Sequence, residues 1–132
     1  MEQTLVFIKP DGVERGLVGE VLSRFEKRLI KILKLELKTL TEDQVDTHYA
    51  EHINKPFYPD LKSYILSGPI ALMVLESENV ISIIRKMVGV TNSAEAAPGT
   101  IRGDYALTTS HNIIHASDST DSAKREIGNF FS

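Results

Sequence analysis

The pattern of apolar and polar positions divides the first third of the chain into strand-like and helix-like segments. Residues 5–8 form a compact apolar run that ends at the turn sequence Lys-Pro-Asp-Gly of residues 9–12, which predicts a strand followed by a turn. Apolar residues then recur at helical spacing over residues 13–25, which predicts a single helix. Over residues 33–38 leucine alternates with charged residues, which predicts a strand with one exposed face.

Helix-start signals and a second apolar run mark the middle of the chain. Thr41-Glu-Asp-Gln44 matches a capping box and predicts a helix through about Tyr49, and a short helix is expected after Pro56. Residues 70–76 are predicted to form a buried strand, and Ser77 is expected to cap the helix that follows. The apolar stripe of that helix consists of Val80, Ile81, Ile84 and Val88.

The last third of the chain begins with a long irregular segment. Residues 90–104 contain one proline and two glycines and are predicted to form a loop, and loops of that length in compact domains are usually functional. A short strand is expected near His115, and a final helix is expected from about Thr120, behind a Ser119 cap, to a stop at Gly128.

The order of these elements favours an α+β fold. Strands and helices interleave, but the helices are too few for a doubly wound parallel sheet. We therefore expect a sandwich in which helices cover one face of a four-stranded sheet. We treat residues 1–132 as a single domain, which is a length that allows one sizeable core.

Composition and charge narrow the class of protein. An apolar content of 42% and a charged content of 25% are ordinary for a globular domain, and the net charge of −3 argues against a dedicated nucleic-acid surface. There are no cysteines, so disulfides and thiolate chemistry are excluded. The first residues lack the layout of a secretion signal, and residues 70–75, the longest apolar run, are too short to span a bilayer. We expect a cytoplasmic protein that does not enter membranes.

Residues 112–119 (Asn-Ile-Ile-His-Ala-Ser-Asp-Ser) are the most informative segment for chemistry. They place His115 after a β-branched pair and before a cluster of helix-starting residues. A histidine in this setting can be held in one orientation and given neighbours that select its tautomer, as a nitrogen nucleophile or an acid/base group requires. His48, His52 and His111 have no such setting, and we expect them to be surface groups.

A set of polar residues that a core does not require suggests a site for a polyanion. Three cations, a hydroxyl and an amide belong to it, and guanidinium groups match phosphate oxygens in geometry. The set consists of Lys9, Arg85, Thr91, Arg102 and Asn112, together with His115 and, on the final helix, Glu126. Because phosphohistidine forms and breaks readily, His115 becomes a candidate phosphate acceptor.

This set, in this order, resembles the nucleoside diphosphate kinases over about residues 4–131. The matching blocks are Ile8-Lys-Pro-Asp-Gly12, Arg15-Gly-Leu-Val-Gly19, His48-Tyr49, Lys55-Pro-Phe57, Ser67-Gly-Pro69, Thr91-Asn92, Pro98-Gly-Thr-Ile-Arg-Gly-Asp104, and the His115 segment continued by Ser122-Ala-Lys-Arg-Glu-Ile-Gly128. The resemblance implies a ferredoxin-like βαββαβ sandwich with a four-stranded antiparallel sheet covered by helices. It also implies ping-pong exchange of the terminal phosphate between nucleoside triphosphates and diphosphates through a phosphohistidine.

The resemblance assigns a role to each candidate residue. His115 would be the nucleophile, Glu126 would accept the proton of its other ring nitrogen, and Ser117 would orient Glu126. The remaining roles would belong to Lys9 (transferring phosphate and ribose), Asn112 (sugar), Arg85, Thr91 and Arg102 (outer phosphates), Tyr49 (near the nucleophile) and Phe57 (stacking on the base).

Further expectations follow from the same resemblance. Mg²⁺ would arrive on the nucleotide phosphates, with no metal ligands of the protein's own, and the chain would form a homo-oligomer, with a hexamer favoured over a tetramer or dimer. Because no residue is an obvious reader of a base edge, we expect broad base specificity. Leu29 stands where the family commonly has glycine, so the left-handed helix stop is either strained or rebuilt.

Other interpretations of the same residues stay open at this stage. His115 alone would also fit a histidine phosphocarrier that passes phosphate between proteins, although Phe57, Arg85 and Arg102 would then have no task. A non-catalytic nucleotide-binding module would retain the pocket without the chemistry. Asp118 and Ser119 are interpreted as helix-start residues.

Overall fold

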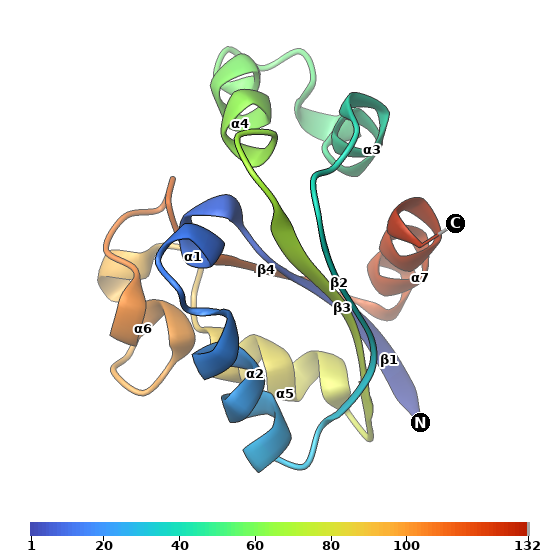
Figure 1. The fold of residues 1–132 in the computed structure, drawn as a ribbon, viewed down its shortest axis with the longest axis vertical. Coiled ribbons are helices and arrows are strands. Elements are labelled where there is room, and N and C mark those ends of the chain that lie inside the picture. The colour runs from blue at the N-terminus through green and yellow to red at the C-terminus, as the bar shows by residue number, and fades with distance from the viewer. Residues whose placement is uncertain (132) are drawn as a thin grey trace.

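The computed structural model describes residues 1–131, in which four strands form one antiparallel sheet in the order β2-β3-β1-β4 (Figure 1). The strands are β1 (Glu2–Ile8), β2 (Lys31–Lys38), β3 (Ile70–Ser77) and β4 (Ile114–Ala116). The helices are α1 (Pro10–Glu14), α2 (Val18–Lys27), α3 (Glu42–His48), α4 (Tyr58–Ile65), α5 (Val80–Val88), α6 (Ile101–Tyr105) and α7 (Thr120–Phe130), with 3₁₀ turns at Ala50–His52 and Ser93–Glu95. The antiparallel α+β sandwich is confirmed.

Helices cover both faces of this sheet, so the expectation of one covered face was wrong. Alternate residues of a strand point to opposite faces, and β1 and β3 are apolar at consecutive positions. Val6 and Met73 belong to a core packed under α2 and α5, whereas Phe7 and Leu72 belong to a second core packed against α3, α4 and α7. Figure 1 shows α2 and α5 on one side of the sheet and α3 and α7 on the other.

The edge strand β2 leaves its apolar side chains open to solvent. The expected alternation is present, but Leu33, Leu35 and Leu37 are 37%, 49% and 64% exposed. A register shift between Ile32 and Lys34 places Leu33 in a bulge, and within residues 1–131 no helix covers the leucines that follow. Lys34 and Glu36 are exposed as well, so both faces of this strand are open to solvent and one of them is apolar, which the alternation alone does not reveal.

Two helices begin where their capping residues predict. Thr41 Oγ1 accepts a hydrogen bond from the Gln44 backbone N–H at 3.1 Å while the Gln44 side chain accepts one from the Thr41 N–H at 3.0 Å, which completes the capping box of α3. Ser119 Oγ accepts from the Ser122 N–H at 3.1 Å and caps α7. Helix α7 continues to Phe130, beyond its expected stop, because an isolated glycine such as Gly128 does not end a helix that packs well.

Three boundaries differ from the sequence prediction. The single helix expected over residues 13–25 is two helices, because Gly16 adopts a positive φ of 74° between them. Ser77 is the last residue of β3, and α5 begins after Asn79, so Ser77 is not the cap. The long loop contains helix α6, whose cap is Thr100, a residue type that favours this position.

Leu29 holds the left-handed conformation that follows α2, with φ 67° and a side chain that is 89% exposed. The turn is thus strained rather than rebuilt.

We expect Leu29→Gly to raise the free energy of unfolding by about 1 kcal/mol, because only glycine adopts this φ without steric cost. Urea denaturation measures the change. Arg28→Gly is the matched control: Arg28 has a negative φ of −83°, so that variant should be less stable than the starting protein. Equal effects of the two substitutions would contradict the strain.

Candidate active site

Most of the predicted site residues line one cavity where β1 and β4 meet α5 and α7. Eight of them contribute to its wall: Lys9, Tyr49, Arg85, Thr91, Arg102, Asn112, His115 and Glu126. Ser117 lies behind Glu126, and Phe57 lines an adjoining cavity that also touches Lys9. The sequence did not single out Glu51, Ser122 and Arg125, which complete the wall with Ala116 and Asp118.

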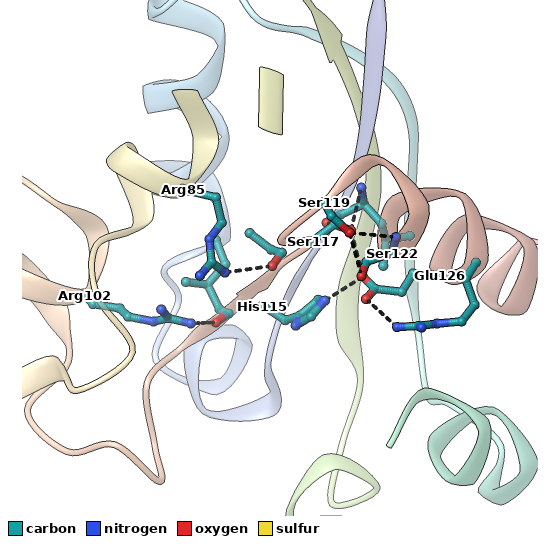
Figure 2. A network of polar contacts seen from close by, with 11 residues as sticks. Arg85, Arg102, His115, Ser117, Ser119, Ser122 and Glu126 are labelled. Carbon is teal, nitrogen blue, oxygen red and sulfur yellow. Dashed lines mark hydrogen bonds and ion pairs between the residues drawn. The ribbon is translucent and has the colours of Figure 1, made fainter. Parts of the chain in front are cut away.

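His115 is held in place by strand geometry and by stacking. It lies on β4 opposite Phe7 of β1, and the two rings stack with centroids 4.9 Å apart. Its Nε2 lies 2.7 Å from Glu126 Oε1, a contact drawn in Figure 2. Because a carboxylate only accepts, Nε2 carries the proton and Nδ1 keeps a free lone pair.

The carboxylate of Glu126 is itself fixed by the sheet. Ser117 Oγ donates to Glu126 Oε1 at 2.7 Å, and the Ser117 backbone N–H donates to the Leu5 carbonyl at 3.1 Å. Burial would raise the pKa of Glu126, but the hydrogen bonds from His115 and Ser117 outweigh it and leave that pKa below its ordinary value. Burial lowers the pKa of His115, against the opposing effect of the Glu126 carboxylate. The pair is therefore an anionic carboxylate and a neutral imidazole near pH 7.

Lys9 supplies a partly buried positive charge next to this pair. It follows the last residue of β1, and its Nζ donates to Asn112 Oδ1 at 2.6 Å. Burial, reinforced by the charge of Arg102, lowers the pKa of Lys9 to about 8. A lysine in this state is protonated at neutral pH and gains strongly from an anion placed beside it.

Two arginines are anchored to carbonyl oxygens around β4 (Figure 2). Arg102 is buried and donates to the carbonyls of Gly89 at 3.1 Å, Ile114 at 2.6 Å and Asn112 at 3.4 Å. Arg85 Nη1 donates to the carbonyl of Ala116 at 3.2 Å. The three bonds fix the plane of the Arg102 guanidinium group, and the remaining N–H groups of both arginines stay available to an anion in the cavity. Burial, together with the charge of Arg85, lowers the pKa of Arg102 to about 10.

The chain enters β4 through a tight turn at Ile113. Its φ is 74°, and the Ile114 N–H donates to the Asn112 carbonyl at 2.8 Å, which closes a γ-turn. The Lys9 N–H donates to the Ile113 carbonyl at 2.6 Å and ties the turn to β1. A β-branched residue at this φ is strained, and such strain persists only where the surrounding structure enforces it. Here it brings Asn112 and His115 to the same cavity.

The remaining predicted residues are Phe57, Tyr49 and Thr91. Phe57 precedes α4, is 50% exposed, and lines a mostly apolar cavity with Lys9, Leu61, Tyr64 and His111. Tyr49 ends α3 and lines the main cavity, and its neighbour His48 is 4.4 Å away between ring centroids. Thr91 contributes to the wall, and its carbonyl accepts from Asn112 Nδ2 at 3.5 Å. The site thus has a cationic end and an apolar end that meet at Lys9.

The structure also corrects two expectations about neighbouring residues. His48 is not a surface group: its ring meets that of His115 edge to face at 4.6 Å, and its Nδ1 is buried without a partner. Burial lowers the pKa of His48 to about 3, so this imidazole is neutral. Its place beside Tyr49 was the only signal available in the sequence. Asp118 lines the cavity as well as preceding the cap of α7, so its interpretation as a helix-start residue alone was incomplete.

This arrangement suits covalent transfer of an anionic group. The free Nδ1 lone pair is a nucleophile, Glu126 stabilises the positive charge that the ring acquires when it attacks, and four cationic side chains line the cavity. The aromatic ring of Phe57 lies in the adjoining cavity that Lys9 also lines, a place suited to the flat, non-reacting part of an elongated ligand. The geometry supports a group carrier that binds a ligand with a charged end and a flat end.

Comparison with known proteins gives a consistent result. A family model described as nucleoside diphosphate kinase matches residues 2–132. The chain is 60% identical to a nucleoside diphosphate kinase of Methanocorpusculum labreanum and 54% identical to one of Halalkalibacterium halodurans, over 99% of its own length and 88% and 89% of theirs. It resembles the solved structure of a halophilic nucleoside diphosphate kinase from Halobacterium salinarum in complex with CDP, with a TM-score of 0.96 at 44% identity, and covers 88% of that chain with 99% of its own. A family member from Babesia bovis gives a TM-score of 0.97 at 45% identity, with coverage of 100% and 89%.

Proposed function

Because this chain belongs to the nucleoside diphosphate kinase family, whose members are phosphotransferases, we propose that it carries the transferred phosphate on His115. The single observation behind this assignment is the contact between His115 Nε2 and Glu126 Oε1 at 2.7 Å, which leaves Nδ1 free. The substrates are nucleoside triphosphates and diphosphates, and residues 1–132 act as one domain.

The exchange runs in two steps that mirror each other. The Nδ1 lone pair attacks the terminal phosphorus of a nucleoside triphosphate, the bond to the bridging oxygen breaks, and the nucleoside diphosphate leaves with those electrons. A terminal oxygen of a second nucleoside diphosphate then attacks the phosphorus, and the N–P bond returns its electrons to Nδ1. Throughout, the proton stays on Nε2 and is donated to the Glu126 carboxylate, which Ser117 keeps in place.

The cationic end of the cavity holds the phosphates in line with the imidazole. Lys9 meets the transferring group, Arg85 and Arg102 hold the outer phosphates with Thr91, and Asn112 contacts the sugar. Tyr49 closes the side near the nucleophile. Phosphoryl transfer needs mainly positioning and charge neutralisation, and this set of residues supplies both.

Mg²⁺ fits this pocket as an ion bound through the phosphates. Lys9, Arg85 and Arg102 would hold the phosphate oxygens that carry it, and the ion supplies neutralisation of the charge that develops during transfer. Among the described residues, the one group of three metal-ligand side chains contains two imidazoles, a chemistry that does not suit a hard cation.

A labelled-phosphate experiment tests the function. The protein is incubated with ATP labelled at the terminal phosphate, freed of nucleotide, and then given unlabelled CDP. Acid-labile label on the protein followed by label in CTP is expected. Label that passes only to another protein would favour a phosphocarrier, and tight nucleotide binding without a phosphoprotein would favour a non-catalytic module.

The low pKa of Lys9 predicts a loss of activity in alkaline solution. We expect kcat/KM to fall as the pH rises through about 8, because the free enzyme then loses the Lys9 charge. Stability should change in the opposite direction: the cost of burying the ammonium, present below pH 8, fades as the pH rises towards 10.5. Lys9→Arg should abolish this alkaline decrease in kcat/KM, whereas Lys55→Arg, at an exposed lysine, should keep it. An unchanged alkaline decrease in the Lys9 variant would mean that another group causes it.

The half-exposed ring of Phe57 predicts broad base specificity. Phe57→Ala should weaken all nucleotides to a similar degree, with KM rising by about tenfold, because stacking contributes about 1–3 kcal/mol per base. Steady-state kinetics with purine and pyrimidine diphosphates measure this change, and Leu29→Ala serves as an exposed apolar control. A loss confined to purines would indicate a base-specific contact instead.

The remaining parts of the proposal concern assembly and location. The exposed leucines of β2 support a homo-oligomer, since a strand edge with apolar side chains is stabilised by a second copy, and we favour a hexamer over a tetramer or dimer. Sedimentation measurements decide the stoichiometry. The cytoplasmic location expected from the sequence stays a prediction. Among residues 1–131, no helix combines the length and apolar character needed to cross a bilayer.

A further inference from the structure

Three potential metal ligands meet behind the reactive face of the imidazole. His48, His115 and Glu126 each offer one ligand atom, and these atoms all lie within 4.8 Å of one another. They come from α3, β4 and α7, so the packing of the second core brings them together. Two imidazoles and one carboxylate are a ligand set that zinc commonly uses in open sites, in which a fourth position is left to water.

We propose that His48, His115 and Glu126 form a site for a divalent transition metal such as Zn²⁺, and that its occupancy switches off phosphate transfer. The inhibitory part of this proposal rests on the proposed role of His115, but the binding part does not. The site differs from that of Mg²⁺, because imidazole nitrogens favour Zn²⁺, Cu²⁺ and Ni²⁺ over hard cations.

The three ligand atoms would have to shift relative to one another to hold the ion. Ligands bound at about 2.0–2.2 Å in a tetrahedron are about 3.3 Å apart. His115 Nε2 and Glu126 Oε1 are already 2.7 Å apart and would have to separate slightly, and His48 would have to approach them. The His48 ring packs edge to face against the His115 ring with a centroid distance of 4.6 Å, so a modest rotation of its side chain can supply that movement.

His48 has a ring nitrogen without a hydrogen-bond partner, which favours its use as a metal ligand. Its Nδ1 is buried and has no hydrogen-bond partner, an arrangement that costs free energy and that a metal or a bound proton would relieve. Glu126 is anionic and would offset the charge of the ion.

Metal binding would inactivate the nucleophile by changing its tautomer. A neutral imidazole has one proton, which Nε2 now donates to Glu126. When Nε2 gives its lone pair to the metal, the proton moves to Nδ1, and no lone pair then faces the phosphate cavity. The Nδ1–P bond cannot form, and the enzyme stays unphosphorylated until the metal leaves.

Direct binding to the whole protein is the first test. Chelator-treated, nucleotide-free protein is dialysed against Zn²⁺, and Co²⁺ serves as a spectroscopic probe of coordination. We expect one equivalent per chain, a tetrahedral Co²⁺ spectrum, and an affinity that falls by about tenfold or more in His48→Phe. His52→Gln, at another histidine of the same region, should bind as the unaltered protein does. Zinc X-ray absorption of the unaltered protein should report two imidazole ligands and oxygen, whether or not the His48 variants fold.

The inhibitory part has a separate readout. Zinc-loaded protein, freed of excess metal, is expected to lose at least about 90% of the phosphoprotein formed from labelled ATP, and chelation should restore it. Absence of binding, an affinity unchanged in both His48→Phe and His48→Gln, or a spectrum without imidazole would overturn the site. Binding that leaves phosphoprotein formation intact would overturn the switch. If the metal-free protein itself forms no phosphoprotein, the proposed function fails, and the binding result is judged on its own.

Discussion

His115→Ala should reduce nucleoside diphosphate kinase activity by about 10⁴-fold or more, because it removes the only atom proposed to form a bond with phosphorus. The fold should survive, since the ring faces the cavity on one side and the backbone of β4 keeps its pairing with β1. Coupled assays measure the exchange, and circular dichroism with urea denaturation checks the fold.

The control for this substitution is His52→Ala, which removes a partly exposed imidazole outside the cavity wall and should leave exchange within a few-fold of its starting value. Label from ATP should remain on the control protein and be absent from the His115 variant. Appreciable turnover by the His115 variant, with label still covalently attached, would reject His115 as the nucleophile and point to another acceptor.

Arg102→Lys should be the second most damaging change, although it conserves charge. Lysine has one nitrogen in place of the fork that donates to the carbonyls of Gly89, Asn112 and Ile114. Buried carbonyls that lose a charged donor cost about 1–3 kcal/mol each, so we expect the free energy of unfolding to fall by about 3 kcal/mol. Exchange should fall by about 100-fold, because the γ-turn at Ile113 and the phosphate grip both depend on this side chain.

Urea denaturation and steady-state kinetics separate the two contributions of Arg102. Arg28→Lys, at an exposed position beyond α2, should change neither stability nor exchange. A variant at position 102 that kept full stability but lost exchange would show that the carbonyl contacts are dispensable and that Arg102 acts on phosphate alone.

The local signals in the sequence predicted the elements they directly encode. The Thr41 and Ser119 caps are made by side chains within three residues of their partners, so sequence spacing alone was enough. The apolar stripe of α5 was also read correctly, since Val80, Ile81, Ile84 and Val88 are all buried. Interactions of this range depend little on the rest of the fold.

Errors arose where burial depends on distant elements. The leucines of β2 alternate as expected for a half-buried strand, but whether a helix covers them depends on how distant helices pack on the sheet. The coverage of both faces was implied by uninterrupted apolar runs in β1 and β3, because a strand with one wet face should alternate. His48 was placed on the surface because a histidine at the end of a helix gives no local sign of burial.

For the site too, residue types could be read from the sequence, but features that depend on tertiary packing could not. His115, Lys9 and Arg102 could be selected by residue type and setting, and the resemblance to the family placed them together. That Arg102 donates to three main-chain carbonyls, and that Ile113 has a positive φ, are consequences of tertiary packing that no sequence spacing encodes. These two features fix the orientation of β4 and so place Asn112 and His115 at the cavity, and they could be known only from the structure.

The pairing of β4 with β1 also bears on how the protein is made. Of the four strands of the sheet, β1 is translated before β4, so a nascent chain carries Lys9 long before it carries His115 and Glu126. Joining these segments means closing most of the polypeptide into one loop, a slow event for a domain of this size. Catalytic competence is therefore acquired only after β4 and α7 have been made, and products of premature termination upstream of β4 would contain part of the sheet without the ability to turn over nucleotides.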